Sequence, residues 1–369
     1  MAEALSQRGH EVHVVTYHLG DRSIPLPFAV HRIRDVPSYT DCSPGPTLRK
    51  LLHLDPLLVG RVGRLLDSMP FDVVHAHHYE GLLVALLSGA RRRRPPVVYD
   101  AHTLLASELP YYGMGLSRGM KSFLGSWLDR SLPPRADHII AVTDSIRDSL
   151  LATTCIGGDR VTLVTNGVES EHFSAVQPLS GRHPARRRIV FAGNLAAYQG
   201  VDLLLRAFEL IRRRCADARL SFLTDSDFAP YVALAESLGI RGSIDVFNPD
   251  YAALPAYLQS ADVLLNPRPE CDGIPQKLLN YMAAGRPIVS FAGSARIIEH
   301  ETTGLLVENG DVNAFAAATL RLLLHPQLGD RLGANAQRLA NSDFGWQRAA
   351  AKTEEVYASL LNRRQGASA

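Results

Sequence analysis

The strongest constraint on this chain is a regular alternation of short apolar strands with helical patterns, which runs through two successive blocks of sequence. The first block has predicted strands at 12–17, 71–78, 95–102, 136–143 and 160–168, and the second at 188–194, 218–225, 243–248, 261–267, 287–293 and 304–311. Strands that alternate with helices form parallel sheets covered by helices. The sequence therefore predicts an α/β fold with two Rossmann-like, doubly wound domains that face a cleft.

The boundary between the two blocks is marked by composition. Residues 175–188 are rich in Pro, Gly, Ser and Arg, as linkers are. We expect a first domain over 1–175, a second over 186–343, and a final amphipathic helix over 344–361 that packs back on the first domain. A length of 369 residues is also more than one ordinary core accommodates.

The chain opens on the last turns of a helix, followed by Gly9 and a strand, with no strand before the helix. A doubly wound domain ordinarily opens with a strand and then a loop at the edge of the sheet where ligands bind. We favour the interpretation that this first strand and loop are missing from the sequence. A small variant of the fold that lacks them is the alternative.

Several classes of function are disfavoured by composition. The formal net charge of +2 gives no reason to expect nucleic acid as a partner. Four scattered cysteines without a Cys-x-x-Cys pair argue against a structural zinc or disulfide framework. No apolar run is long enough to span a bilayer and no secretory segment is present, so we expect a cytoplasmic protein rather than a periplasmic binding protein. No Gly-x-Gly-x-x-Gly follows a strand, which disfavours a nicotinamide oxidoreductase.

The stretch DGIPQKLLNYMAAGRPIVS, residues 272–290, predicts a helix with clear ends and a polar beginning. Pro275 suits the first turn, and Gly285 suits a left-handed cap before the next strand. Gln276 and Asn280 lie four residues apart and share one face. A solvated face is the ordinary explanation for such residues, but Asp272 and Gly273 directly precede this helix.

A second segment of the same kind covers residues 189–208, where a strand leads through Gly193 and Gly200 into a helix. Asn194 and Gln199 supply polar side chains between the two glycines. The free N–H groups at a helix N-terminus bind anions. With Gly273, Ile274 and Pro275 leading into the second helix, we expect residues 193–200 and 273–277 to form a cradle for a diphosphate, hereafter the cradle.

Histidines gather at the ends of two predicted strands of the first block. His75 and His77 share one face of their strand, but no Cys or carboxylate lies at metal-ligand spacing in the sequence. We therefore expect packing or cleft lining, and no metal. His102 lies just past a strand, at the ligand-binding edge, where Asp100 could orient it. The run Arg91–Arg94 is most simply a solvated turn, with weak contact to anionic lipid headgroups as the alternative.

Taken in order, these segments resemble the family 4 (group 1) glycosyltransferases, which are retaining enzymes with the GT-B fold. The resemblance is carried by RGHEVHVVT, FDVVHAHH, AVTDSIRDSL and VTLVTNGVESEHF in the first block, and by GNLAAYQGVDLLLRAF, ADVLLNP, PQKLLNYMAAGRPIVS and GLLVENGD in the second. The family's cleft histidine matches His102. The family's Gly-rich turn is replaced here by LTDSD at 223–227, and its first Gly-rich loop is the portion that is absent.

The resemblance also exposes substitutions at the donor site. The family's Arg and Lys on the donor diphosphate match Asn194 and Gln199, and its two glutamates match Asp272 and Asn280. Neutral side chains form weaker bonds to phosphate than charged ones do. Lys277 and Arg268 are candidate replacements for the missing positive charge.

The function implied by the resemblance is transfer of a hexose-type sugar from a nucleotide diphosphate sugar to a glycan, lipid-linked or small-molecule acceptor, without a metal. Asp272 would hold the sugar hydroxyls, Asn280 the ribose, and His102 the sugar or the acceptor. Asn248 and Tyr251 are candidates near the base. Two alternatives stay open: a truncated nucleotide-binding relative without turnover, and a nucleotide-sugar epimerase.

Overall fold

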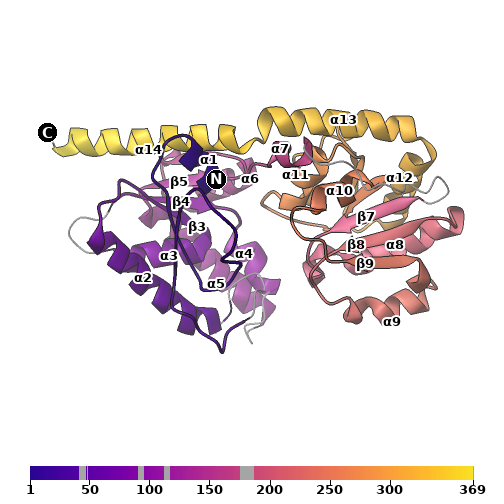
Figure 1. Cartoon of the computed structure of the whole chain (residues 1–369), viewed down its shortest axis with the longest axis horizontal. Helices are drawn as coiled ribbons and strands as arrows, with labels where there is room; N and C mark the ends of the chain where they lie inside the picture. The colour runs from indigo at the N-terminus through magenta and orange to yellow at the C-terminus, as the bar shows by residue number, and fades with distance from the viewer. Residues whose placement is uncertain (41–46, 48, 90–94, 112–116, 175–186, 369) are drawn as a thin grey trace. The chain divides into compact units, whose positions relative to one another are not determined.

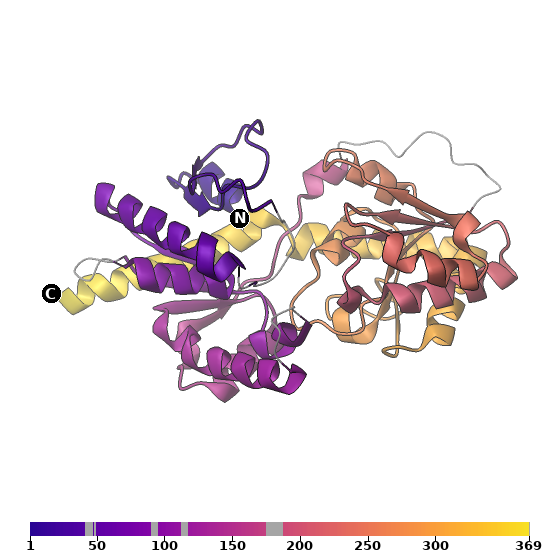
Figure 2. The same cartoon turned by 90° about the horizontal axis from the view of Figure 1, so that it is seen from below.

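The computed structural model describes residues 1–40, 47, 49–89, 95–111, 117–174 and 187–368. These residues form two compact units. Unit 1 contains residues 1–165 and 346–369, and unit 2 contains residues 166–345. Each unit is an α/β structure built on parallel strands (Figures 1 and 2). None of the helices in the described part of the chain is long and apolar enough to cross a membrane.

The described residues of unit 1 form two parallel sheets rather than the single sheet that the sequence predicted. The larger has the order β3 (Val74–His77), β4 (Val97–Ala101), β5 (His138–Ala141) and β6 (Val161–Leu163). The smaller pairs β1 (His13–Thr16) with β2 (Ala29–Arg32). Sequence reasoning missed β2, because Ala29 and Val30 are followed at once by His31 and Arg32 and leave only a very short apolar run.

The helices of unit 1 cover both faces of the larger sheet. Val97, Tyr99 and Ile139 point into a core shared with the helical layer on one face, whereas Val98 and Ile140 point to the other face and contact the last helix. The helices are α1 (Ala2–Gln7), α2 (Asp55–Ser68), α3 (His78–Ser88), α4 (Leu105–Glu108), α5 (Arg118–Ser131), α6 (Asp144–Thr153) and α14 (Trp346–Ser368).

Unit 2 is built on one six-stranded parallel sheet with the order β12-β11-β10-β7-β8-β9. Its strands are β7 (Arg188–Ala192), β8 (Arg219–Leu223), β9 (Ile244–Phe247), β10 (Val263–Asn266), β11 (Ile288–Phe291) and β12 (Leu305–Val307). Its helices are α7 (Ser170–Ser174), α8 (Val201–Arg214), α9 (Ala229–Ser237), α10 (Leu254–Gln259), α11 (Gln276–Ala283), α12 (Val312–Leu324) and α13 (Pro326–Asp343). Two apolar cores lie on the two faces of the sheet, because alternate residues such as Ile189 and Val190 point to opposite sides.

The boundary between the units lies earlier in the chain than the sequence predicted. Residues 166–174 belong to unit 2, where Val168 bridges to Gly345 and Phe173 is buried in the core. Residues 175–186 of the expected linker lie outside the described part of the chain, as do Arg91–Arg94. The last helix starts at Trp346 and belongs to unit 1.

Candidate functional site in unit 2

The order of strands in unit 2 places a topological switch point between β7 and β10. The chain runs from β7 to β8 on one side, and it reaches β10, on the other side of β7, only after β9. The loops that leave two such strands diverge, so a crevice opens at their carboxyl ends, where open α/β sheets bind ligands. Here these loops are residues 193–200, which lead into α8, and residues 267–275, which lead into α11.

The two loops touch at Gly200. This residue has φ of 70°, and a Cβ atom built on it would lie 2.2 Å from the carbonyl oxygen of Pro267. Gly193, at the other end of the first loop, has φ of 133°. Both positions therefore require glycine, one because of the close approach and both because of the backbone conformation. The sequence correctly predicted that the two halves of the cradle are neighbours.

Lys277 lies at the centre of this arrangement. Its Nζ donates a hydrogen bond to Oε1 of Gln199 over 2.5 Å and lies 4.3 Å from the ring centroid of Phe191. Gln199 in turn lies 3.4 Å, through Nε2, from Oδ1 of Asn194, which also accepts from the amide of Ala196. Three of the predicted donor-site residues, from both halves of the cradle, thus form one hydrogen-bonded chain.

The charge of Lys277 is not balanced by an acid. Burial, together with the nearby positive charge of Arg268, lowers the pKa of Lys277 to about 7. Among the described residues, no carboxylate pairs with its ammonium group; its hydrogen bond goes to a neutral amide. An ammonium group in this environment is stabilised by an arriving anion.

Arg268 supplies a second cation at the same edge. Its guanidinium lies 4.8 Å above the ring of Tyr198 in the first loop, and its Nε donates to the carbonyl of Glu270. Arg268 and Lys277 are the two residues that the sequence suggested as replacements for lost positive charge. The structure places both beside the 193–200 loop.

The helix that follows the second loop begins one residue later than predicted. Pro275 is the N-cap of α11 rather than a first-turn residue. Gly285 has φ of 67°, as a left-handed cap requires. Gln276 donates to the carbonyl of Gly167, so it holds the start of unit 2 and does not contribute to the cradle.

Two buried residues that sequence reasoning missed fix the cradle. The hydroxyl of Tyr281 donates to the carbonyl of Leu265 at 3.3 Å and accepts from the amide of Ala192 at 2.7 Å, which ties the end of β7 to β10. Asn266, at the end of β10, donates to the hydroxyls of Ser290 and Ser294, each at 2.8 Å. Asn266 is a polar residue at the end of an otherwise apolar strand, and this was the sequence signal that could have revealed its contacts with the serines.

The remaining predicted residues lie in or just after the second loop. Asp272 is partly buried, Gly273 and Ile274 are buried, and Asn280 lies partly buried one turn into α11. They lie at the switch point, where open α/β sheets bind ligands.

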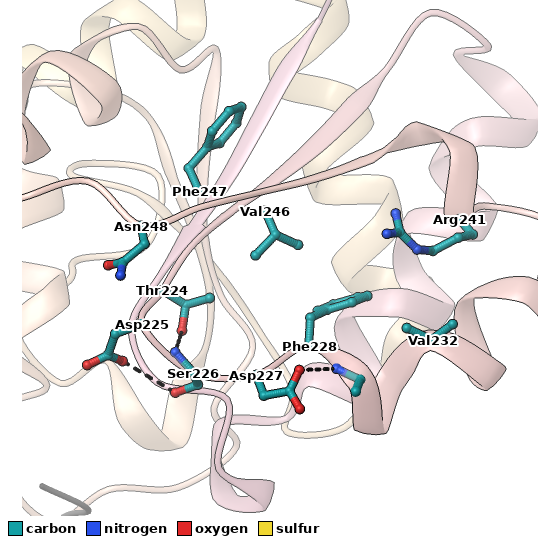
Figure 3. Close-up of a pocket in the computed structure, with 11 residues that line it drawn as sticks. Thr224, Asp225, Ser226, Asp227, Phe228, Val232, Arg241, Val246, Phe247 and Asn248 are labelled. Carbon is teal, nitrogen blue, oxygen red and sulfur yellow. Dashed lines mark hydrogen bonds between the residues drawn. The ribbon is translucent and has the colours of Figure 1, made fainter.

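A cavity of about 620 Å³ lies at the carboxyl ends of the neighbouring strands β8 and β9 (Figure 3). The hydroxyl of Ser226 accepts from the amide of Leu195, so the cavity and the cradle share a wall. Asn248 lines this cavity, whereas Tyr251 does not: its ring stacks on His172 and its hydroxyl donates to Glu169. The lining residues are Thr224, Asp225, Ser226, Asp227, Phe228, Ala229, Val232, Arg241, Val246, Phe247 and Asn248.

Three histidines of unit 1 converge on one buried carboxylate. Oδ2 of Asp100 lies 3.1 Å from His77 and from His102 and 3.3 Å from His75. The absence of a nearby carboxylate in sequence was therefore misleading, because β3 and β4 are parallel neighbours that place His77 opposite Asp100. Nδ1 of His75 also lies 2.6 Å from the hydroxyl of Tyr357 on α14. Asp100 orients His102, as the sequence suggested.

The ligand atoms of His75, His77 and Asp100 lie within 4.8 Å of one another, close enough to surround a metal ion. However, the rings of His75 and His77 are stacked, with an interplanar angle of 17° and centroids 4.7 Å apart. A metal lies in the plane of each imidazole that binds it, so two stacked rings would have to rotate before both could bind one ion. The arrangement fits a hydrogen-bonded cluster better than a metal site.

This cluster makes the stability of unit 1 sensitive to acid. Burial lowers the pKa of His75, although its hydrogen bond to Asp100 opposes the shift. Burial alone would raise the pKa of Asp100, but attraction to His102 and the hydrogen bonds from the three histidines hold it well below its usual value. Below the usual histidine pKa of 6.5, the unfolded chain therefore binds a proton at position 75 that the folded chain does not.

We expect the free energy of unfolding to fall as the pH is lowered from about 6.5, and His75→Gln to make this fall less steep. The difference in slope is at most about 1.4 kcal/mol per pH unit, the value for one proton. Urea unfolding at a series of pH values measures it, with His53→Gln, at an exposed position of unit 1, as the control. An unchanged slope in the His75 variant would mean that burial does not depress this pKa.

Comparison with known proteins decides the family. The model of Glycosyltransferase Family 4 matches residues 1–172, and that of Glycosyl transferases group 1 matches residues 186–325. The chain belongs to the family 4 (group 1) glycosyltransferases. This glycosyltransferase is 27% identical over 315 residues to a D-inositol 3-phosphate glycosyltransferase from Xylanimonas cellulosilytica, covering 80% of this chain and 73% of the relative. It is 26% identical to a sulfoquinovosyl transferase from Arabidopsis thaliana, covering 97% of this chain and 69% of the relative.

The fold of this glycosyltransferase is GT-B, as the sequence predicted. It resembles sucrose-phosphate synthase from Thermosynechococcus elongatus with a TM-score of 0.81 and 19% identity, covering 98% of this chain and 92% of the other. It also resembles the Anabaena protein HepE, solved in complex with UDP-glucose, with a TM-score of 0.68 and 15% identity, covering 94% and 99% of the two chains. The prediction of a glycosyltransferase enzyme is thus confirmed.

Proposed function

We propose that this glycosyltransferase transfers a hexose-type sugar from a nucleotide diphosphate sugar to a glycan, lipid-linked or small-molecule acceptor, with retention of configuration. The observation that carries the proposal is the cradle: two helix N-termini and two cations, Lys277 and Arg268, at the switch point between β7 and β10. A diphosphate is the natural occupant of such a site, because it is a compact anion that accepts hydrogen bonds from several directions.

The chemistry follows from the leaving group. As the bond between the sugar and the diphosphate breaks, negative charge grows on the phosphate oxygen, and fixed donors around that oxygen lower the barrier. The amides at the starts of α8 and α11, with Lys277 and Arg268, would supply these donors without a metal. Asn194 and Gln199 would bind phosphate more weakly than charged residues at those positions.

The neighbouring cavity suits the nucleoside part of the donor. Its wall includes Ser226, whose hydroxyl accepts from the amide of Leu195 in the cradle, and it is lined by the exposed ring of Phe247 and the amide of Asn248 (Figure 3). Aromatic faces stack on bases, and an amide can both donate to and accept from a base edge. The relative solved with UDP-glucose makes UDP-sugars the first donors to test.

Three side chains are assigned roles in binding the donor or the acceptor. Asp272, in the second loop of the cradle, would hold the sugar hydroxyls, and Asn280, one turn into α11, would bind the ribose. His102, oriented by Asp100 at 3.1 Å, would contact the sugar or the acceptor. No protein nucleophile is assigned, because attack on the same face of the sugar as the leaving group needs none.

Incubation with a panel of nucleotide sugars tests this proposal. We expect slow release of one nucleoside diphosphate above the buffer rate, accelerated when a suitable acceptor is added. Conversion of one nucleotide sugar into its epimer would instead establish the epimerase alternative. Binding without release would establish the non-catalytic alternative, and no binding of any donor would overturn the donor site itself.

Asp272→Ala should lower the rate of sugar transfer at least 100-fold and change nucleoside diphosphate affinity less than threefold, because its carboxylate is assigned to the sugar and not to the phosphates. Initial rates and calorimetric titration with the diphosphate measure the two effects. Asp330→Ala, at an exposed position of the same unit, is the control. Equal losses of rate and affinity would assign Asp272 to the nucleotide.

A further inference from the structure

Four imidazole rings contact one another in succession at the carboxyl ends of β3 and β4. The rings of His75 and His77 have centroids 4.7 Å apart, and those of His77 and His102 lie 5.6 Å apart. The ring of His78 stacks on His102, with centroids separated by 4.6 Å. The proposed function uses His102 alone, so the chemistry of its neighbours is unassigned.

Asp100 decides where the protons of His77 and His102 lie. Burial would raise the pKa of Asp100, but its interactions with the histidines hold this pKa well below the usual value, so the side chain is an ionised carboxylate that only accepts hydrogen bonds. Nδ1 of His77 and Nε2 of His102 each lie 3.1 Å from Oδ2 of Asp100. Both nitrogens therefore carry hydrogen. They lie 3.3 Å from each other because they converge on the same oxygen.

The outer nitrogens of the same two rings are hydrogen-bond acceptors. A neutral imidazole has a single N–H, so a proton directed at Asp100 leaves a lone pair on Nε2 of His77 and on Nδ1 of His102. The side chain of Asp100 is only 6% exposed, whereas that of His77 is 51% exposed and that of His102 is 20% exposed. The accessible sides of the two rings, away from the buried carboxylate, therefore present acceptors and no donor.

His75 shows the same arrangement with the outer partner in place. Its Nε2 lies 3.3 Å from Oδ2 of Asp100, so its Nδ1 is the acceptor, and the hydroxyl of Tyr357 lies 2.6 Å from that Nδ1. This cluster thus already contains one imidazole whose outer nitrogen accepts from a hydroxyl group. Within the described part of the chain, no hydrogen bond reaches Nε2 of His77 or Nδ1 of His102.

We propose that His77 is a second substrate-contacting residue beside His102, and that the outer nitrogens of this pair accept hydrogen bonds from hydroxyl groups of an uncharged sugar. The inference rests on the proposed function and names the chemistry that unit 1 recognises. A hydroxyl group fits because it donates a proton to a lone pair, as Tyr357 does to His75. A phosphate or carboxylate only accepts and would face two lone pairs. The sugar belongs to the donor or to the acceptor, and the kinetic measurements below separate these two sources.

Nitrogen NMR tests the proton positions without any substrate. The full chain is labelled with ¹⁵N-histidine and long-range ¹H–¹⁵N spectra are recorded at pH 8, where histidine side chains are ordinarily neutral. We expect the proton of His77 on Nδ1 and that of His102 on Nε2. The signals are assigned by their loss in His77→Gln and in His102→Gln. A proton on Nε2 of His77 or on Nδ1 of His102 would overturn the proposal, because that outer nitrogen would then be a donor.

Two variants of His77 test the contact with the sugar. His77→Phe keeps a flat ring beside His75 but has no lone pair, whereas His77→Gln keeps an acceptor oxygen. With the most active donor of the panel and its acceptor, we expect His77→Phe to lower kcat/KM about tenfold or more and His77→Gln to stay within about threefold of wild type. His53→Phe, at an exposed position of unit 1, is the control.

The same variants show which sugar is bound and separate this proposal from the donor site. Slower hydrolysis of the donor in water by His77→Phe would place the sugar in the donor, and a loss confined to transfer would place it in the acceptor. Nucleoside diphosphate affinity should be unchanged, because the cradle lies in unit 2. Wild-type turnover with an unaffected His77→Phe variant, or equal losses in His77→Phe and His77→Gln, would overturn the contact alone. A wild-type chain that turns over no donor would overturn the proposed function and the contact together.

Discussion

Lys277→Met is expected to weaken the binding of a nucleoside diphosphate about 10–150-fold. The substitution keeps most of the side-chain volume and removes the ammonium group that lies between the two loops of the cradle. A hydrogen bond to a charged group contributes about 1.5–3 kcal/mol, which corresponds to this range of affinity. Titration calorimetry measures it, with Lys352→Met on α14 as the control.

The same variant should change how stability depends on pH. The pKa of Lys277 is about 7 in the folded protein and has an ordinary value of 10.5. Between these values the unfolded chain binds a proton that the folded chain lacks, so the free energy of unfolding rises with pH, by at most about 1.4 kcal/mol per unit. Lys277→Met should remove this rise. An affinity within threefold of wild type would contradict the role of Lys277 in anion binding, whatever its pKa.

Gly200→Ala is expected to be the most damaging single-methyl change in unit 2. The new Cβ would lie 2.2 Å from the carbonyl oxygen of Pro267, so the two loops of the cradle would have to separate. Gly239→Ala is a matched control, because Gly239 has φ of 68°, close to the 70° of Gly200, but no atom within 4 Å of a Cβ. Both variants suffer the left-handed backbone cost of about 1–2 kcal/mol.

The difference between the two variants isolates the contact between the loops. We expect Gly200→Ala to lower the free energy of unfolding by about 1–3 kcal/mol more than Gly239→Ala, the usual cost of an overpacked site. Its diphosphate affinity should also fall at least tenfold, while that of Gly239→Ala is unchanged. Denaturant unfolding and calorimetry measure the two effects. Equal stability of the two variants would show that the loops separate without cost.

The alternation of strands and helices was sufficient to predict the fold, because the spacing of apolar residues and the presence of turn residues are local properties of the sequence. The proximity of the two loops of the cradle was predictable for the same reason: each half is a strand, a glycine and a helix start. By contrast, β2 has too few apolar residues to stand out. The hydroxyl of Tyr281 joins β7 to β10, and the amide of Asn266 reaches from β10 to β11, so their partners become evident only once these strands are known to be neighbours.

The histidine cluster illustrates the same limit in unit 1. His75 and His77 were recognised as a pair on one strand, but Asp100 comes 23 positions or more later in the sequence and meets them through the pairing of β3 with β4.

The most direct test of the diphosphate cradle is calorimetric titration of the purified chain with the diphosphates of uridine, guanosine, adenosine, cytidine and thymidine, each beside its parent nucleoside. For one base at least, the diphosphate should bind at least 100-fold tighter than the nucleoside. At pH 8, binding should also take up a proton at Lys277, seen as a heat that varies with the ionisation enthalpy of the buffer. Equal affinities for diphosphate and nucleoside, or a diphosphate preference that Lys277→Met leaves unreduced, would contradict the cradle.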